Sequence, residues 1–96
     1  MSSAPYRTVQ QTRFVGALAN AWAAIDLTPG MIDWMLSTED GVAFRFSTVN
    51  TLNPLNQGTP IQANARLTNS GTVTQAQTVY AAPSGNTVFI LVFNLA

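Results

Sequence analysis

The chain has 96 residues, of which only eight carry a formal charge, and its net charge is zero. Typical soluble domains are about one quarter charged. The four cations are all arginine, and the absence of lysine, histidine and cysteine excludes disulfide bonds, thiol or imidazole metal ligands and the common nucleophile–base pairs of catalysis. A neutral, charge-poor surface has little repulsion to keep copies apart, so the composition indicates a subunit that packs against other protein, and a homo-oligomer.

The length fits one small domain, which would bury only about 60–65% of its unfolded surface. The apolar run at residues 88–93 is far shorter than the roughly 18 residues of a membrane span, and the polar opening residues do not resemble a secretory signal. We therefore expect no membrane association. Four arginines balanced by four acids give no basic patch, so we expect no nucleic acid as a partner.

Residues 1–13 differ from the rest of the chain, because they hold two of the four arginines and few apolar residues. They predict an N-terminal arm or a first edge strand, ahead of a single β domain at residues 14–96. Arginine makes paired hydrogen bonds to carboxylates on a partner. Tyr6, Arg7 and Arg13 are therefore candidate partner-binding residues, and we expect the arm to become ordered only on binding.

Residues 14–27 support two interpretations. A helical stripe is formed by Val15, Leu18, Trp22 and Ile25. The alternative is a loop to residue 21 and a strand from Trp22, with Ala23, Ile25 and Leu27 on one face. We favour the strand because everything downstream has β character. The Thr-Pro-Gly sequence at 28–30 then predicts a turn.

The clearest predicted hairpin joins residues 31–36 to residues 42–47 through a polar linker that ends in glycine. Both segments alternate apolar and polar residues. If Leu36 pairs with Val42, the same register pairs Trp34 with Phe44 and places Asp33 opposite Arg45. The hairpin would then have an apolar face and an outer face with an ion pair.

The segment at 48–60 is rich in asparagine, proline and glycine and predicts a long loop. Long loops are often contact elements, so Asn53, Pro54 and Asn56 are further candidate partner-binding residues. Alternation at 61–67 predicts another strand, and the threonine-rich residues 72–77 fit either an exposed strand or a loop.

The chain closes with a second predicted hairpin, in which residues 78–82 and 87–93 flank a Pro-Ser-Gly-Asn turn. Nearly every residue of 87–93 is apolar, which indicates a central strand, or a strand with one face on the core and the other on a neighbouring subunit. The regular spacing of turns predicts six to eight short strands in an all-β fold, a small β-sandwich or jelly-roll-like barrel.

The residues offer no catalytic site and no cofactor or metal site. Glu39 and Asp40 are neighbours on one loop, whereas hydrolytic carboxylate pairs face each other across a substrate, and a calcium site needs more oxygen ligands. We expect no enzymatic activity. The aromatic residues Trp22, Tyr6 and Tyr80 leave open a sugar-binding module for host attachment.

The chain resembles small β proteins of tailed bacteriophage virions. The resemblance covers residues 22–93 and rests on a tryptophan-bearing strand at 22–27, a Pro-Gly turn, a strand at 32–37 that ends in polar residues, and a closing Tyr-Ala, turn, valine-rich strand at 79–93. It implies a structural virion protein, most simply a capsid decoration (cement) subunit that binds the major capsid protein, with a tail or fibre component as the alternative. The long loop at 48–60 departs from the pattern.

Overall fold

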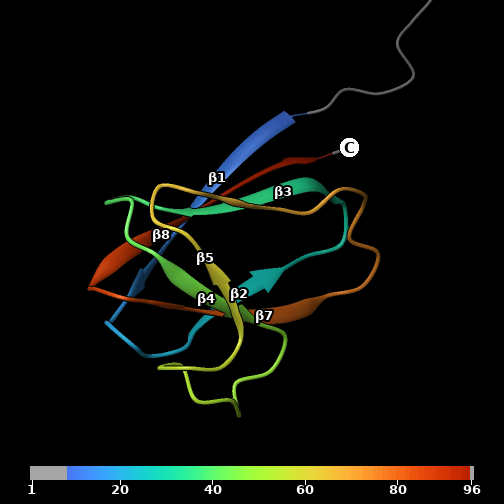
Figure 1. Ribbon diagram of the computed structural model, residues 1–96. Coiled ribbons are helices and arrows are strands. Elements are labelled where there is room, and N and C mark those ends of the chain that lie inside the picture. The colour runs from blue at the N-terminus through green and yellow to red at the C-terminus, as the bar shows by residue number, and fades with distance from the viewer. Residues whose placement is uncertain (1–8, 96) are drawn as a thin grey trace, which may run out of the picture.

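A computed structural model describes residues 9–95, which form eight strands in two antiparallel sheets and no helix (Figure 1). Sheet A has the order β1 (Val9–Ala17), β8 (Thr87–Leu95), β3 (Met31–Thr38), β6 (Leu67–Thr68). Sheet B has the order β2 (Ala23–Leu27), β7 (Gln77–Pro83), β4 (Phe44–Ser47), β5 (Thr59–Ile61). The predicted all-β class, a small sandwich of six to eight strands, is confirmed.

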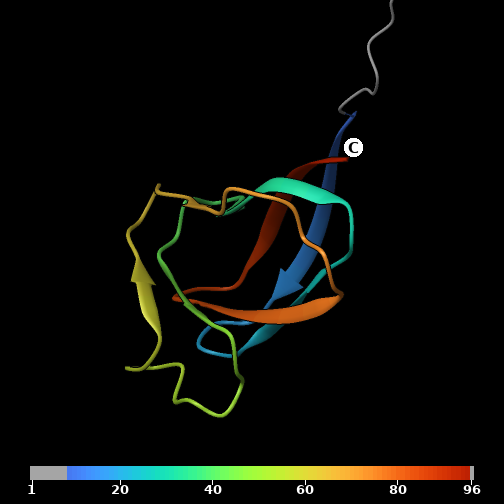
Figure 2. The same ribbon diagram turned by 90° about the vertical axis from the view of Figure 1, so that its right-hand side faces the viewer.

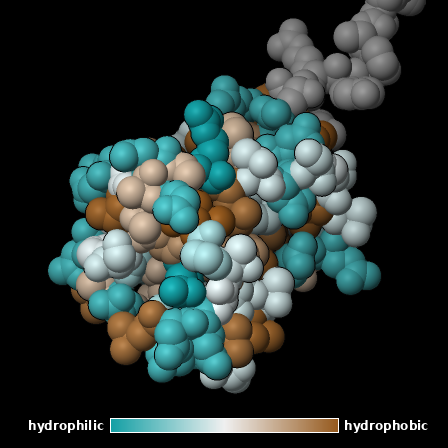
Figure 3. Space-filling view, in the orientation of Figure 1, coloured by the Kyte–Doolittle hydropathy of each residue, from teal (hydrophilic) through white to brown (hydrophobic). Residues whose placement is uncertain are grey.

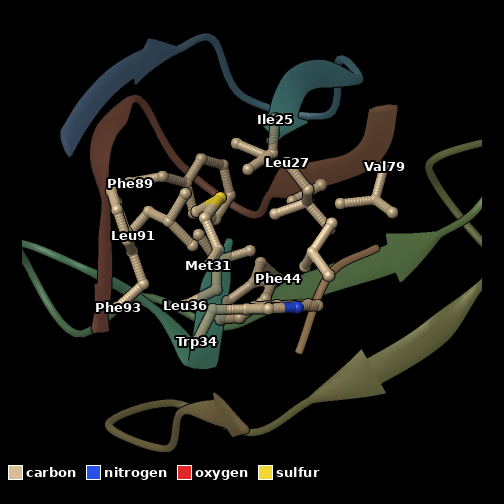
Figure 4. Close-up of a cluster of buried hydrophobic side chains, with 12 residues drawn as sticks. Ile25, Leu27, Met31, Trp34, Leu36, Phe44, Val79, Phe89, Leu91 and Phe93 are labelled. Atoms are coloured by element: carbon tan, nitrogen blue, oxygen red, sulfur yellow. The ribbon is translucent and has the colours of Figure 1, made fainter. Parts of the chain in front are cut away.

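The core lies between the two sheets, as the view turned by 90° shows (Figure 2). Figure 4 shows side chains of both sheets meeting there. Phe89 of sheet A packs edge-on against Phe44 of sheet B with ring centroids 5.2 Å apart, and Trp34 lies 6.1 Å from Phe46. Buried aromatic pairs of this kind stabilise a core beyond the area that they bury.

Strand β1 occupies the edge of sheet A and pairs with β8 along its whole length, from Val9 opposite Leu95 to Ala17 opposite Thr87. The N-terminal segment was predicted to be either an arm or an edge strand, and residues 9–13 form part of an edge strand. Tyr6 and Arg7 lie outside the described residues.

The helical interpretation of residues 14–27 is wrong. Residues 14–17 continue β1, and Asn20, with φ of 56°, lies in the turn that leads to β2. The favoured strand exists but begins at Ala23 and not at Trp22, with Ile25 and Leu27 facing the core. The buried residues of this short segment follow the two-residue alternation of a strand and not the 3.6-residue period of a helix.

The predicted hairpin of residues 31–36 and 42–47 is wrong. Strand β3 pairs with β8 and β6 in sheet A, whereas β4 pairs with β7 and β5 in sheet B. The linker therefore crosses from one sheet to the other. Trp34 still faces the core, but it meets Phe46 across the sandwich and not Phe44 along a ladder. Asp33 and Arg45 lie in different sheets, so the predicted ion pair does not form.

A β-bulge at Asp33 also changes the expected faces of β3. The register shifts by one residue between Ile32, which lies opposite Asn94, and Met35, which lies opposite Val92. The extra residue reverses the alternation. Met31 is therefore buried before the bulge and Trp34 after it, while Ile32 faces outward.

Two further predictions are wrong, because the chain crosses from one sheet to the other where the sequence analysis kept it within one sheet. Residues 61–67 are not one strand, because β5 ends at Ile61 in sheet B and β6 begins at Leu67 in sheet A. The closing segments are strands, but β7 lies in sheet B and β8 in sheet A, so they form no hairpin. The chain crosses between sheets inside the segment 61–67 that was predicted to be one strand, and again at the turn that was predicted to close a hairpin at 83–86.

Candidate binding surfaces

Three of the four carboxylates in the described residues accept hydrogen bonds from groups of the same chain. Asp26 accepts a hydrogen bond from the Thr78 hydroxyl at 3.0 Å, and Asp40 accepts one from Thr87 at 3.1 Å. Asp33 accepts one from the Gly71 amide at 2.8 Å. Within residues 9–95, no three acidic, histidine or cysteine residues are grouped to hold a metal ion.

Arg13, a predicted partner-binding residue, is engaged within its own chain. Its guanidinium donates to the Asp26 carbonyl oxygen at 3.3 Å and to the Thr28 hydroxyl at 3.4 Å, and its Cζ lies 5.0 Å from the centre of the Phe93 ring. Because Phe93 belongs to sheet A and Asp26 to sheet B, Arg13 links the two sheets at their open edge. Its side chain is nonetheless exposed, and its role toward a partner stays a prediction.

The other predicted contact residues lie in the loop at 48–58, which connects β4 to β5 and lies beyond sheet B on the side away from sheet A (Figures 1 and 2). Asn53 shapes a turn here, because its side chain accepts from the Leu55 amide at 3.0 Å and its backbone amide donates to Gln57. Pro54 and Asn56 belong to the same turn. The projecting residue is Leu55, which is 64% exposed and which sequence reasoning missed.

Trp22 fastens this loop to the sandwich. Its indole N–H donates to the Leu52 carbonyl oxygen at 2.8 Å, and its ring packs so close to Gly58 that a β-carbon there would lie 3.1 Å from the ring. Trp22 is half-buried and its one donor is occupied. It is therefore a structural anchor for this loop, and the sugar-binding alternative stays a prediction.

Beneath the loop, the β4 side of the outer face of sheet B is covered by the chain itself, whereas Ala24, Asp26 and Thr78 on the same face are exposed. Ala82 and Arg45 face outward here, since their neighbours Ala81 and Phe46 face the core. Ala82 is nonetheless only 3% exposed. A hollow of about 310 Å³ remains between these residues and the loop residues Pro54 and Leu55.

The outer side of sheet A carries an apolar cluster, which we call the outer patch. Phe89 and Leu91 of β8 point into the core, so the residues between them point outward. Their cross-strand partners in β1 and β3 share this face. The outer patch consists of Phe14, Ile32, Met35, Val88, Ile90 and Val92.

Within the described part of the chain, the outer patch has neither acidic residues nor a loop that covers it. Its neighbours on the same face include Thr12, Ser37 and Asn94, which are polar and uncharged. Arg66 reaches its margin, with Nη1 3.9 Å from the Met35 sulfur. Phe14 is 66% exposed and the other members are half-buried. The sequence signal for this surface was the uninterrupted apolar run of β8.

The rest of the surface is mixed. In the orientation of Figure 1, hydrophobic residues reach the surface between hydrophilic ones (Figure 3). No described helix is long and apolar enough to span a membrane. Comparison with known proteins found no matching family, no matching characterised protein and no matching solved structure.

Proposed function

We propose that the chain is a non-enzymatic structural subunit that binds other protein through the outer patch. The observation that carries this proposal is an apolar sheet face that residues 9–95 leave uncovered, although the loop at 48–58 covers part of the opposite face. Burial of apolar surface is the dominant force in protein association. The virtual absence of charge on this face suits packing against protein and gives no site for chemistry.

We further propose that the subunit belongs to the virion of a tailed bacteriophage, as a capsid decoration protein on the major capsid protein. The support is the sequence resemblance over residues 22–93 together with the charge-poor composition. A decoration subunit must bind by its surface alone, and a rigid sandwich with one apolar face meets that requirement.

The proposed location is tested on particles of the encoding phage, banded by density and probed with an antibody against the chain. We expect label on the capsids. Label on tails alone, or no label, would overturn the decoration role.

The proposed surface is tested by competition for particle binding. The double variant Ile90→Thr/Val92→Thr keeps the β-branched shape of the outer patch and removes its apolarity. It should bind particles at least about tenfold more weakly, since each lost apolar contact contributes of order 1 kcal/mol. The control is Val49→Thr, an exposed valine in the loop on the far side of sheet B, which should bind like the unchanged chain. Equal binding by all three proteins would exclude the outer patch as the contact.

A further inference from the structure

Strand β1 is a sheet edge that no other segment of residues 9–95 covers. Exposed edges invite pairing with another strand unless they are short, charged or interrupted by proline. Among the edge strands described here, β6 has two residues, β5 contains Pro60, and β2 carries the exposed Asp26. Strand β1 has nine residues, no proline and one charged residue. That residue, Arg13, is turned toward Asp26 and Phe93 and so does not guard the edge.

The sequence of β1 is complementary to itself about Val15. In an antiparallel pair of β1 strands centred on Val15, Phe14 of one copy lies opposite Gly16 of the other, and Arg13 lies opposite Ala17. Phe14 and Gly16 share the outward face, because their partners in β8 are Ile90 and Val88. A β-carbon added at Gly16 would meet no atom within 4 Å, so the space above this glycine is open.

This register covers the two large apolar side chains that are most exposed in the described chain. Phe14 is 66% exposed and Leu18, just beyond the end of β1, is 69% exposed. With Phe14 placed over Gly16 of a second copy, its diagonal neighbours are Phe14 and Leu18 of that copy. An aromatic ring over a cross-strand glycine is a known stabilising arrangement in sheets. The turn after Leu18 leaves the edge, because Asn20 donates to the Pro83 carbonyl oxygen at 2.7 Å.

We infer that two copies of this chain pair through β1, antiparallel and centred on Val15, to join their A sheets into one eight-stranded sheet. The two-fold arrangement places no like charges opposite each other, since Arg13 faces Ala17. It also ends the assembly at a dimer, because the other edge of sheet A is the two-residue β6. The inference rests on the proposed function in one respect: it names a second copy as one protein that the subunit binds.

Cysteine cross-linking tests the register, because the chain has no cysteine of its own. Two Val15→Cys residues would be direct cross-strand neighbours at the two-fold axis, within the usual span of a disulfide. Under mild oxidation we expect most of this variant to form a covalent dimer. The matched control is Thr12→Cys on the same strand. Its copies would lie about 20 Å apart, at about 3.3 Å for each of six residues, and should stay monomeric. No cross-link at Val15, or equal cross-linking at both positions, would overturn the register.

Gly16→Val tests the same contact without a cross-link. The valine fits the monomer, because space is open and φ is not positive, but it occupies the place of the Phe14 ring. We expect dimerisation to weaken at least about tenfold in sedimentation equilibrium, while the thermal midpoint measured for the monomer stays or rises. The swapped variant Phe14→Gly/Gly16→Phe restores the facing pair and should regain dimerisation. Undiminished association of Gly16→Val would overturn the inference.

The two proposals fail separately. If Val15→Cys does not cross-link and yet the chain labels capsids, the pairing is wrong and the proposed function stands. If Val15→Cys cross-links but no particle carries the chain, the pairing stands and the virion role fails.

Discussion

Asp33 shows how one residue redirects a whole strand. Its φ is 50°, a conformation that aspartate and asparagine tolerate better than most residues. Its amide donates to the Gly71 carbonyl oxygen at 3.0 Å, and its carboxylate accepts from the Gly71 amide at 2.8 Å. The bulge that it forms places Trp34 in the core. Strict alternation along the strand predicted an ion pair between Asp33 and Arg45, but the partner of the carboxylate is the backbone amide of Gly71.

The effect of substituting Asp33 on the free energy of unfolding should therefore depend on whether the new residue keeps the hydrogen bond and tolerates positive φ, and not on its charge. Asp33→Asn keeps an acceptor oxygen and the tolerance for positive φ, so we expect a loss of less than about 1 kcal/mol in the free energy of unfolding. Asp33→Ala loses both and should cost about 2–3 kcal/mol. Urea unfolding measures the difference. Arg45→Ala is the control, and a loss as large as that of Asp33→Ala would restore the ion-pair interpretation.

Trp34 is 3% exposed and lies between the sheets against Phe46. Trp34→Ala should cost about 3–5 kcal/mol in the free energy of unfolding, as large core truncations do. Leu55→Ala removes a side chain that is 64% exposed and should cost less than about 0.5 kcal/mol. Chemical denaturation of both variants tests whether burial, and not hydrophobicity of the residue itself, sets the effect. Similar losses for the two would contradict the assigned core.

At the scale of elements, alternation predicted which residues face the core better than it predicted which strands pair. In β4 Phe44 is buried as expected, whereas β8, whose apolar run shows no alternation, buries every second residue from Thr87 to Phe93 and leaves the others half-buried. The partners were wrong because a five-residue polar turn connects strands equally well within a sheet or across a sandwich. The crossing at 39–43 depends on contacts far away in sequence, such as the Glu39 amide with the Val88 carbonyl oxygen and the Asn64 amide with Gly41. No local pattern reports those contacts.

The candidate surfaces were predictable to a similar degree. The apolar run of β8 indicated either a central strand or a strand with one face on a neighbouring subunit; β8 is a central strand of sheet A, and its outward residues form the centre of the outer patch. Phe14 was missed because its neighbours Arg13 and Val15 gave no strand pattern until β8 supplied the register. The intrachain contacts of Arg13 could not be predicted, because Asp26, Thr28 and Phe93 lie far from it in the sequence.

The loop at 48–58 should loosen when its anchor is altered. Trp22→Phe keeps an aromatic ring over Gly58 but removes the donor to the Leu52 carbonyl oxygen. We expect a loss of about 1 kcal/mol in stability, the contribution of one hydrogen bond. Amide exchange should rise in the loop and stay unchanged in β7 and β8. Hydrogen exchange by mass spectrometry resolves the two regions, and a uniform rise would show that Trp22 supports the whole sandwich.

Truncation tests whether the beginning of β1 is integral. Deleting residues 2–12 removes four of the nine residues that pair with β8, so the thermal midpoint should fall by several degrees, as a loss of 1 kcal/mol or more produces in a domain of this size. Deleting residues 2–8 removes no residue of β1 and should lower it by less. Equal midpoints for the full chain and both truncations would support the arm that the sequence first indicated.

At the scale of the whole molecule, one property connects composition, fold and association. Eight charges in 96 residues leave long-range repulsion close to zero. Among residues 9–95, the loop at 48–58 covers part of sheet B, whereas no segment covers the outer patch or the β1 edge. Both uncovered surfaces adjoin Phe14, so pairing of two copies and docking on a third protein would use neighbouring parts of one continuous sheet.

Self-association should therefore be almost independent of salt. The β1 edge offers backbone groups and the side chains of Phe14 and Leu18, and its arginine is held inside the chain by Asp26 and Thr28. Exposed ion pairs are screened over about 10 Å at 0.1 M salt and over about 3 Å at 1 M, whereas apolar and backbone contacts are not. We expect the dimer dissociation constant from sedimentation equilibrium to change less than about threefold between 0.05 and 0.5 M sodium chloride. A tenfold weakening, about 1.4 kcal/mol, would show that charged groups carry the contact, and the pairing surface would have to be sought near Arg45 or Arg66 instead.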